Sequence, residues 1–232
     1  MISRIDQSKV LRRARLSHAA SLGGLLMLLM SVALPIFNPA LSKPSLFLMI
    51  VGLGTSMVGI YYANRWVKKP RPEDRLNASL KSLDHHHVLY HYPNSLPCDH
   101  ILLTPKGVFV LETVNLEGFF TYSSGKWKEK MTSSRALRYI VEEHLGDPIK
   151  SAQSAAHLLQ GELSEKIITE DVIPVEPIVV FVHPHVALNV EHPPIPVCKV
   201  EHLKKRVRLN INHMPSEVYE QIQCYFDSLT AT

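Results

Sequence analysis

Cysteine is scarce in this chain of 232 residues, and its three cysteines, Cys98, Cys198 and Cys224, show no metal-binding spacing. An odd number of widely separated cysteines provides neither a disulfide framework nor a zinc-finger pattern. The sequence also lacks internal repeats and low-complexity tracts, so it gives no indication of a repeat architecture. Cysteines without a disulfide pattern are typical of a protein in a reducing compartment.

A basic field is missing from most of the chain, although the net charge is +4. Residues 1–70 contain nine of the 25 Lys and Arg residues and one of the 21 acidic residues. The remainder therefore has 16 cations against 20 acids, a net charge of −4. This balance argues against a soluble domain that attracts nucleic acid through its overall charge.

Formal charge is also absent from two apolar runs near the N-terminus. Ala19–Phe37 is a run of 19 residues and Leu46–Ala63 a run of 18, and a helix needs roughly 20 apolar residues to cross a membrane. The connection Asn38–Ser45 is short and contains two prolines, which predicts a hairpin of two spans at about residues 19–37 and 46–65. A cleaved signal peptide is the alternative for the first run, but a clear cleavage site is lacking and a second run follows at once.

Cations flank the two runs at their outer ends, with only Lys43 in the connection. They are Arg4, Lys9, Arg12, Arg13 and Arg15 before the first run, and Arg65, Lys68, Lys69 and Arg71 after the second. Because cytoplasmic flanks carry the excess of Lys and Arg, both termini and the soluble domain are expected in the cytoplasm. The predicted organisation is a basic N-terminus (1–18), two membrane helices (19–67) and a cytoplasmic domain (72–232), in a bacterial inner (cytoplasmic) membrane.

The soluble part alternates helical and extended patterns, which predicts an α/β fold with a mixed sheet flanked by helices. We expect helices over residues 72–83, from Asp147 onwards, over 200–207 and over 216–229, with a short helical insertion at 133–145. Strands are expected over residues 85–92, around 119–127 and over 177–182. A proline-broken loop over 192–200 should end in an edge strand.

The most informative stretch is Asp99–Val114, where two apolar runs are joined by a turn, Thr104–Gly107, and bracketed by Asp99 and Glu112. In an antiparallel hairpin the outer ends of the two strands lie opposite one another. The two carboxylates can therefore converge, which is what a hard divalent cation such as Mg²⁺ requires.

This stretch closely resembles the core motif of the nuclease-related domain family, a branch of the PD-(D/E)xK nuclease-like superfamily. The matching features are Asp99-His100, the apolar strand, the glycine turn, Val108-Phe-Val-Leu-Glu112, Asn115 and Gly118. Over residues 72–205 the resemblance also includes Glu73 on the first helix, Trp127, and Asp147-Pro148 at a helix start. It implies a restriction-endonuclease-like mixed sheet flanked by helices.

The resemblance also implies a chemistry, which is metal-dependent cleavage of nucleic acid. By this mapping Asp99, Glu112 and the main-chain carbonyl of Thr113 are metal ligands, Glu73 is a further acid of the site, and the cofactor is Mg²⁺ or Mn²⁺. A cation held in this way polarises the phosphate and lowers the pKa of a water molecule.

Two positions depart from the family pattern. Val114 stands where the family has a lysine, and Ser151 stands where it has a helix glutamine. Because valine has no charge or donor to stabilise an oxyanion, we expect a degenerate nuclease, a pseudoenzyme that keeps metal or nucleic-acid binding. The alternatives are an active nuclease with a displaced lysine, Lys126 or Lys128, and a non-catalytic membrane scaffold or signalling domain.

Histidines form a second cluster, His85–His87 with His91. If residues 85–92 form one strand, alternation puts His85, His87 and His91 on one face, where they can bind a transition metal. The competing interpretation, solvated histidines at a strand edge, is the one that we favour.

Overall fold

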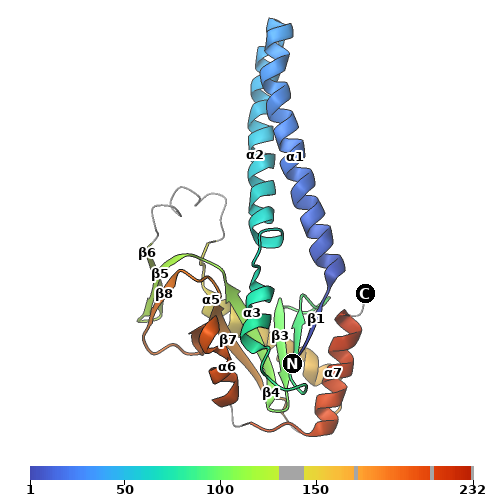
Figure 1. Cartoon of the computed structure of the whole chain (residues 1–232), viewed down its shortest axis with the longest axis vertical. Coiled ribbons are helices and arrows are strands. Elements are labelled where there is room, and N and C mark those ends of the chain that lie inside the picture. The colour runs from blue at the N-terminus through green and yellow to red at the C-terminus, as the bar shows by residue number, and fades with distance from the viewer. Residues whose placement is uncertain (131–143, 170–171, 210–211, 231–232) are drawn as a thin grey trace. The chain divides into compact units, whose positions relative to one another are not determined.

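The structure is a computed structural model, and it describes residues 1–130, 144–169, 172–209 and 212–230. The described chain divides into two compact units (Figure 1). One is the helical stretch Gln7–Arg71, and the other combines Met1–Asp6 with the described residues from Pro72 onwards. The helical insertion predicted at 133–145 falls almost entirely outside the described residues.

The helical unit is a hairpin of α1 (Gln7–Phe37) and α2 (Ser42–Trp66), joined by the short 3-10 helix η1 (Pro39–Leu41). Both helices are long and apolar enough to cross a membrane, and only 11% of the most apolar window of each is buried. Small residues recur every seven positions along the contact and let the backbones approach closely. They are Ser17, Gly24 and Ser31 on α1, and Ser45, Gly52 and Gly59 on α2.

Two contacts show how close the helices are. The Ser17 hydroxyl donates to the carbonyl of Gly59 at 3.0 Å. A Cβ atom added at Gly24 would lie 2.4 Å from the Ser56 hydroxyl and 2.9 Å from the carbonyl oxygen of Gly52. The two helices therefore touch along their backbones at these glycines.

The second unit is built on a six-stranded mixed sheet in the order β1-β2-β3-β4-β7-β9. Its strands are β1 (Ile2–Ile5), β2 (Val88–His91), β3 (His100–Thr104), β4 (Gly107–Val114), β7 (Val175–Phe181) and β9 (Val197–Lys199). β2, β3 and β4 form an antiparallel meander, whereas β7 is parallel to β4 and β9 is parallel to β7. The predicted mixed sheet and the edge strand after the proline-rich loop are confirmed.

A separate three-stranded sheet, in the order β6-β5-β8, consists of β5 (Gly118–Ser123), β6 (Lys126–Lys130) and β8 (Val186–Val190). β6 is antiparallel and β8 parallel to β5. The sequence predicted β5 and the start of β6, but it predicted neither β8 nor the division into two sheets.

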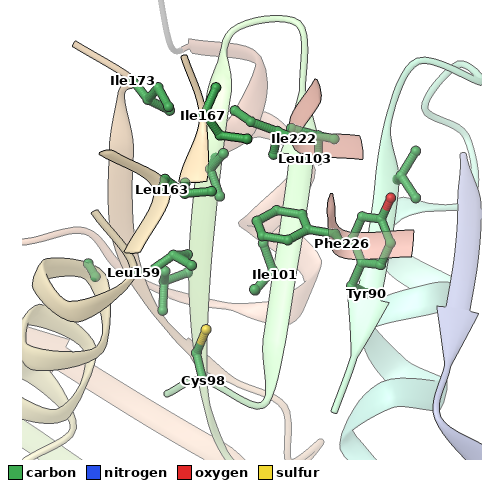
Figure 2. Packing of buried hydrophobic residues seen from close by; sticks show 14 of the residues in the cluster. Tyr90, Cys98, Ile101, Leu103, Leu159, Leu163, Ile167, Ile173, Ile222 and Phe226 are labelled. Carbon is green, nitrogen blue, oxygen red and sulfur yellow. The ribbon is translucent and has the colours of Figure 1, made fainter. Parts of the chain in front are cut away.

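Helices cover both faces of the larger sheet. On one face, α3 (Pro72–Leu80) and α6 (Val200–Leu209) pack on Leu89, Leu102 and Phe109. On the other face, α5 (Pro148–Lys166) and α7 (Ser216–Thr230) pack on side chains that Figure 2 shows pointing together, among them Ile101, Leu103, Leu159, Leu163 and Phe226. A third cluster joins the start of α5, the carboxyl ends of β4 and β7 and the smaller sheet.

The strand β1 is an unexpected element, because residues 1–18 were predicted as a basic terminal segment. Residues 2–5 instead pair in parallel with 88–91 at the edge of the sheet. The Met1 amine donates to the carbonyl of Leu83 at 2.6 Å, and Arg4 forms an ion pair with Asp227 at 2.9 Å. Tyr90 also donates to Asp227, at 2.7 Å, so one carboxylate of α7 links β1 to β2.

Candidate functional site

The predicted hairpin is present as β3 and β4, and its turn is fixed by local contacts. The Thr104 hydroxyl donates to the Gly107 carbonyl at 3.0 Å and accepts from the Lys106 amide at 3.1 Å. Gly107 has a φ of 139°, and a Cβ atom there would lie 2.7 Å from the carbonyl oxygen of Pro174. Glycine is therefore required at this turn.

The register brings Asp99 and Glu112 to corresponding positions. Ile101 pairs with Val110, so two residues further out on each strand Asp99 lies across from Glu112. Asp99 directly precedes β3, and its carbonyl accepts from the Tyr92 amide at 2.6 Å. Both acidic residues are partly exposed, so the hairpin offers two opposed carboxylates at a solvent-accessible end of the sheet.

The main chain at Thr113 points towards this same end. The Val114 carbonyl accepts from the amide of Val182 beyond β7, and backbone groups alternate in direction along a strand. The Thr113 carbonyl therefore points away from β7 and towards the side of β3. A main-chain carbonyl is a hard oxygen donor, the type that Mg²⁺ and Mn²⁺ prefer, and the role of Thr113 as a metal ligand stays a prediction.

Val114, at the family's lysine position, is only 6% exposed. It belongs to the third core cluster, together with Val179, Phe181 and Ile149. This position is thus an apolar packing site, two residues beyond Glu112 and on the same face of the strand.

Neither alternative lysine shares that environment. Lys126 and Lys128 are exposed residues of β6, and they alternate with Trp127, which packs against the third cluster. Because successive side chains of a strand point to opposite faces, both lysines lie on the outer face of the small sheet. Lys106 is at the far turn, where its ammonium group donates to the carbonyl of Arg208 at 3.0 Å.

Glu73 lies in a different environment from Glu112. It is fully buried on α3, the helix that covers the opposite face of the sheet, and its carboxylate accepts from the Tyr92 hydroxyl at 3.0 Å. Tyr92 has a φ of 58°, an uncommon conformation for a large residue. Its ring lies 5.1 Å from that of His100.

Two buried histidines complete this region, and their role was not predicted. The Nδ1 atoms of His91 and His100 are 2.9 Å apart, and Nε2 of His91 is 3.4 Å from the side-chain oxygen of Asn77. One ring must donate and the other accept in the His91–His100 contact. This region therefore holds a cluster of polar side chains from α3, from β2 and the residue after it, and from β3, namely Glu73, Asn77, His91, Tyr92 and His100. In the sequence, the only signal for this cluster is His100, which follows Asp99 in the family motif.

The structure thus separates the predicted acids into a pair, Asp99 with Glu112, and a buried third, Glu73. Among the residues that the structure describes, no group of three or more His, Cys, Asp or Glu side chains has a metal-holding arrangement. The helix positions Ser151 and Gln153 are both exposed on α5 and so face away from the sheet.

The predicted strand placement of the His85–His87 cluster is wrong. β2 begins only at Val88, and residues 85–87 form a turn before it. Nδ1 of His87 lies 2.7 Å from the Asp84 carboxylate, and this hydrogen bond lowers the pKa of Asp84. His91 is buried in the sheet, whereas His85 and His87 precede β2, so these three histidines do not share one strand face.

Comparison with known sequences gives one family match. The sequence model described as "Nuclease-related domain" matches residues 69–182, a stretch that contains Glu73, the hairpin with Asp99 and Glu112, and strands β5 to β7. No curated protein and no solved structure matches the chain.

Proposed function

Residues 69–182 belong to the nuclease-related domain family, and on this premise we propose that the protein is a membrane-anchored member that binds nucleic acid without cleaving it efficiently. The observation that carries this proposal is the burial of Val114 in an apolar cluster. An active site of the family type needs a cationic donor beside the acid, and here that position is occupied by a packed hydrocarbon side chain.

The acidic pair retains the donors for a cation. The Asp99 and Glu112 carboxylates, with the Thr113 carbonyl, would hold Mg²⁺ or Mn²⁺, because partly exposed, opposed carboxylates gain by sharing a divalent charge. Such a cation, when bound, attracts a phosphodiester and lowers the pKa of a water molecule. Asp99 and Glu112 supply the negative charge at this end of the sheet. Val114 has no cationic group that could balance the negative charge developing on the phosphate.

Cleavage assays with the full chain test this proposal. We expect no Mg²⁺- or Mn²⁺-dependent cleavage of single- or double-stranded substrates above background. Val114→Lys should gain metal-dependent cleavage, whereas Val114→Met, an apolar change of similar length, should not. Robust cleavage by the unmodified protein that disappears in Glu112→Ala would overturn the degenerate assignment and favour an active nuclease.

Lys126 and Lys128 enter this test as the displaced-lysine alternative. For that alternative to hold, Lys126→Ala or Lys128→Ala would have to lower a measured cleavage rate by orders of magnitude. Their position on the outer face of the small sheet favours a different role. Absence of both metal and nucleic-acid binding would leave the scaffold alternative.

We also propose that α1 and α2 anchor the domain in the inner membrane, with both termini in the cytoplasm. Large apolar side chains on both helices are exposed, including Leu22, Leu26, Phe37 and Phe47. Their exposure to water is unfavourable, and a lipid environment removes this cost. Pairing of β1 with β2 supports the part of this proposal that puts both flanks of the hairpin on one side of the membrane, since residues 1–6 and the residues from Pro72 onwards belong to one folded unit. An integral anchor predicts that the protein stays in the membrane fraction after alkaline carbonate washing and leaves it only with detergent.

A further inference from the structure

The outer face of the small sheet carries a row of cations. Lys126, Lys128 and Lys130 are exposed at alternate positions of β6, while Trp127 and Glu129 between them are partly buried and point the other way. Three ammonium groups therefore project from one strand in the same direction. They belong to a part of the chain whose overall charge is −4.

The neighbouring strand extends this row into a surface. Phe119, Thr121 and Ser123 of β5 pair directly with Lys130, Lys128 and Lys126, respectively. Phe119 is 44% exposed, although it lies between the buried residues Gly118 and Phe120. We call these three lysines with Phe119, Thr121 and Ser123 the lysine face. It combines cations, hydroxyl groups and an aromatic ring on a flat sheet surface.

The opposite face of the same sheet is accounted for by packing. Phe120, Tyr122 and Trp127 point into the third core cluster, where the ring centroids of Tyr122 and Trp127 are 5.1 Å apart. That packing fixes the sheet and so holds the lysine face in place. A preformed arrangement reduces the entropy lost when a ligand binds.

We propose that the lysine face binds single-stranded nucleic acid, with the lysines on the phosphates and a base stacked on Phe119. This inference rests on the proposed function, because it assigns the surface through which a nuclease-related domain without efficient cleavage holds its ligand. The lysines are thus assigned to backbone binding and not to catalysis.

The spacing of the lysines suits a polyanion. Alternate residues of a strand are about 6.6–6.8 Å apart, which equals two steps of about 3.4 Å along one strand of a stacked nucleic acid. Because about 3.4 Å is only the rise along the axis of a stacked helix, three lysines in a straight line suit the successive phosphates of an extended, unstacked strand. Each contact releases condensed counterions, which gives binding a measurable salt dependence.

The aromatic ring favours a single strand over a duplex. Unpaired bases can splay out and stack on an exposed side chain, whereas the faces of bases within a duplex are already stacked. Phe119 lies at the end of the lysine row, paired with Lys130, so a backbone that follows the row brings a base to the ring. Phosphate contacts give no sequence preference, and we expect sequence-tolerant binding.

The test is equilibrium binding of a fluorescent single-stranded DNA of about 20 nucleotides, longer than the roughly 4–16 nucleotides that a single-strand-binding fold covers. The full chain is held in nanodiscs of zwitterionic lipid. In Lys126→Gln/Lys128→Gln/Lys130→Gln the slope of log K against log salt should fall by about 2, from three contacts at about 0.7 each. Raising salt from about 50 to about 200 mM should then weaken the unmodified protein about 20-fold more than this variant.

Two further variants separate charge from stacking. Phe119→Ala should weaken binding about tenfold without changing the salt slope, and Phe119→Trp should restore it. The matched control Lys81→Gln/Lys166→Gln/Lys205→Gln removes three charges from exposed positions elsewhere. It should stay within about twofold of the unmodified protein, because distant surface charges are screened. Lys126→Arg/Lys128→Arg/Lys130→Arg keeps the three positive charges and should bind like the unmodified protein, which would show that the glutamine variant fails through its loss of charge.

The outcomes distinguish the two proposals. Equal binding by the lysine-face variant and the control variant would overturn this inference and leave nucleic-acid binding elsewhere on the domain. If the unmodified protein binds no nucleic acid, the binding part of the proposed function falls with it. If the lysine-face variant instead loses only binding to vesicles that contain anionic lipid, the surface is a membrane-docking face and the inference is wrong.

Discussion

Removal of the Tyr92 hydroxyl tests whether Glu73 serves the architecture or the chemistry. The hydroxyl donates to the Glu73 carboxylate at 3.0 Å, and both side chains are almost completely buried. A hydrogen bond to a charged group contributes about 1.5–3 kcal/mol. If Glu73 holds α3 on the sheet through this bond, Tyr92→Phe should lower the unfolding free energy of the domain by about that amount.

The expected shift is large enough to measure. For a domain of about 150–250 residues, 1 kcal/mol corresponds to roughly 2–4 °C in Tm, so Tyr92→Phe should lower Tm by about 3–12 °C. Unfolding can be followed by Trp127 fluorescence in a Trp66→Phe background, since Trp127 packs in the domain. Urea titration at about 25 °C then gives the free energy directly.

A double-mutant cycle isolates the pair. Glu73→Ala should cost more than Glu73→Gln, because glutamine keeps an oxygen acceptor for the Tyr92 hydroxyl. The Tyr92→Phe/Glu73→Ala double variant should be more stable than the sum of the single losses implies, with a coupling of about 0.5–3 kcal/mol. Mn²⁺ affinity should be unchanged by Tyr92→Phe. Unaltered stability in Tyr92→Phe, together with loss of Mn²⁺ binding in Glu73→Gln, would refute the structural role and return Glu73 to the metal site.

Three further predictions concern the packing of the α1–α2 hairpin, its orientation in the membrane and the reactivity of Cys198. Gly24→Ala puts a Cβ atom 2.4 Å from the Ser56 hydroxyl of the facing helix and should destabilise the α1–α2 hairpin by about 1–3 kcal/mol in SDS titration. The control is Gly23→Ala, which has open space around it and should be neutral or stabilising. Equal effects of the two substitutions would contradict the close packing of the helices. In sealed cells a membrane-impermeant maleimide should label Ser42→Cys from outside and Cys224, an exposed thiol, only after permeabilisation, and the reverse pattern would invert the topology. Burial raises the pKa of Cys198 from 9.0 to about 11, so its thiolate fraction near pH 7 is about 100-fold lower than that of an unperturbed thiol. The rate of alkylation of Cys198 should therefore rise with pH up to about 11. Fast labelling of Cys198 at pH 7 would contradict its burial.

The local chemistry of the sequence was sufficient to predict the β3–β4 hairpin and the main helices. Thr104–Gly107 contains a proline and a glycine between two apolar runs, and these residues dictate the turn without help from distant parts of the chain. Likewise, α5 begins at Pro148, and the Asp147 side chain accepts from the Lys150 amide at 3.3 Å, as a helix cap does. These features are local, and local signals can be recognised in a sequence.

The environment of each acid could not be predicted in the same way. Alternation along β4 indicates that Glu112 and Val114 share a face, but it does not reveal which helix covers that face. Glu73 is buried and accepts a hydrogen bond from Tyr92, a residue with a φ of 58°. A positive φ at a tyrosine has no sequence signature, because the surrounding contacts impose it.

The first strand shows how a non-local contact changes the functional interpretation. Ile2–Ile5 has only four residues, and a strand of this length has no detectable period, so its pairing with β2 had to come from the structure. Its ion pair with Asp227 then connects the residues before α1 to the last helix of the domain. In a membrane the domain would therefore be held by both ends of the hairpin, by β1 before α1 and by the chain after α2.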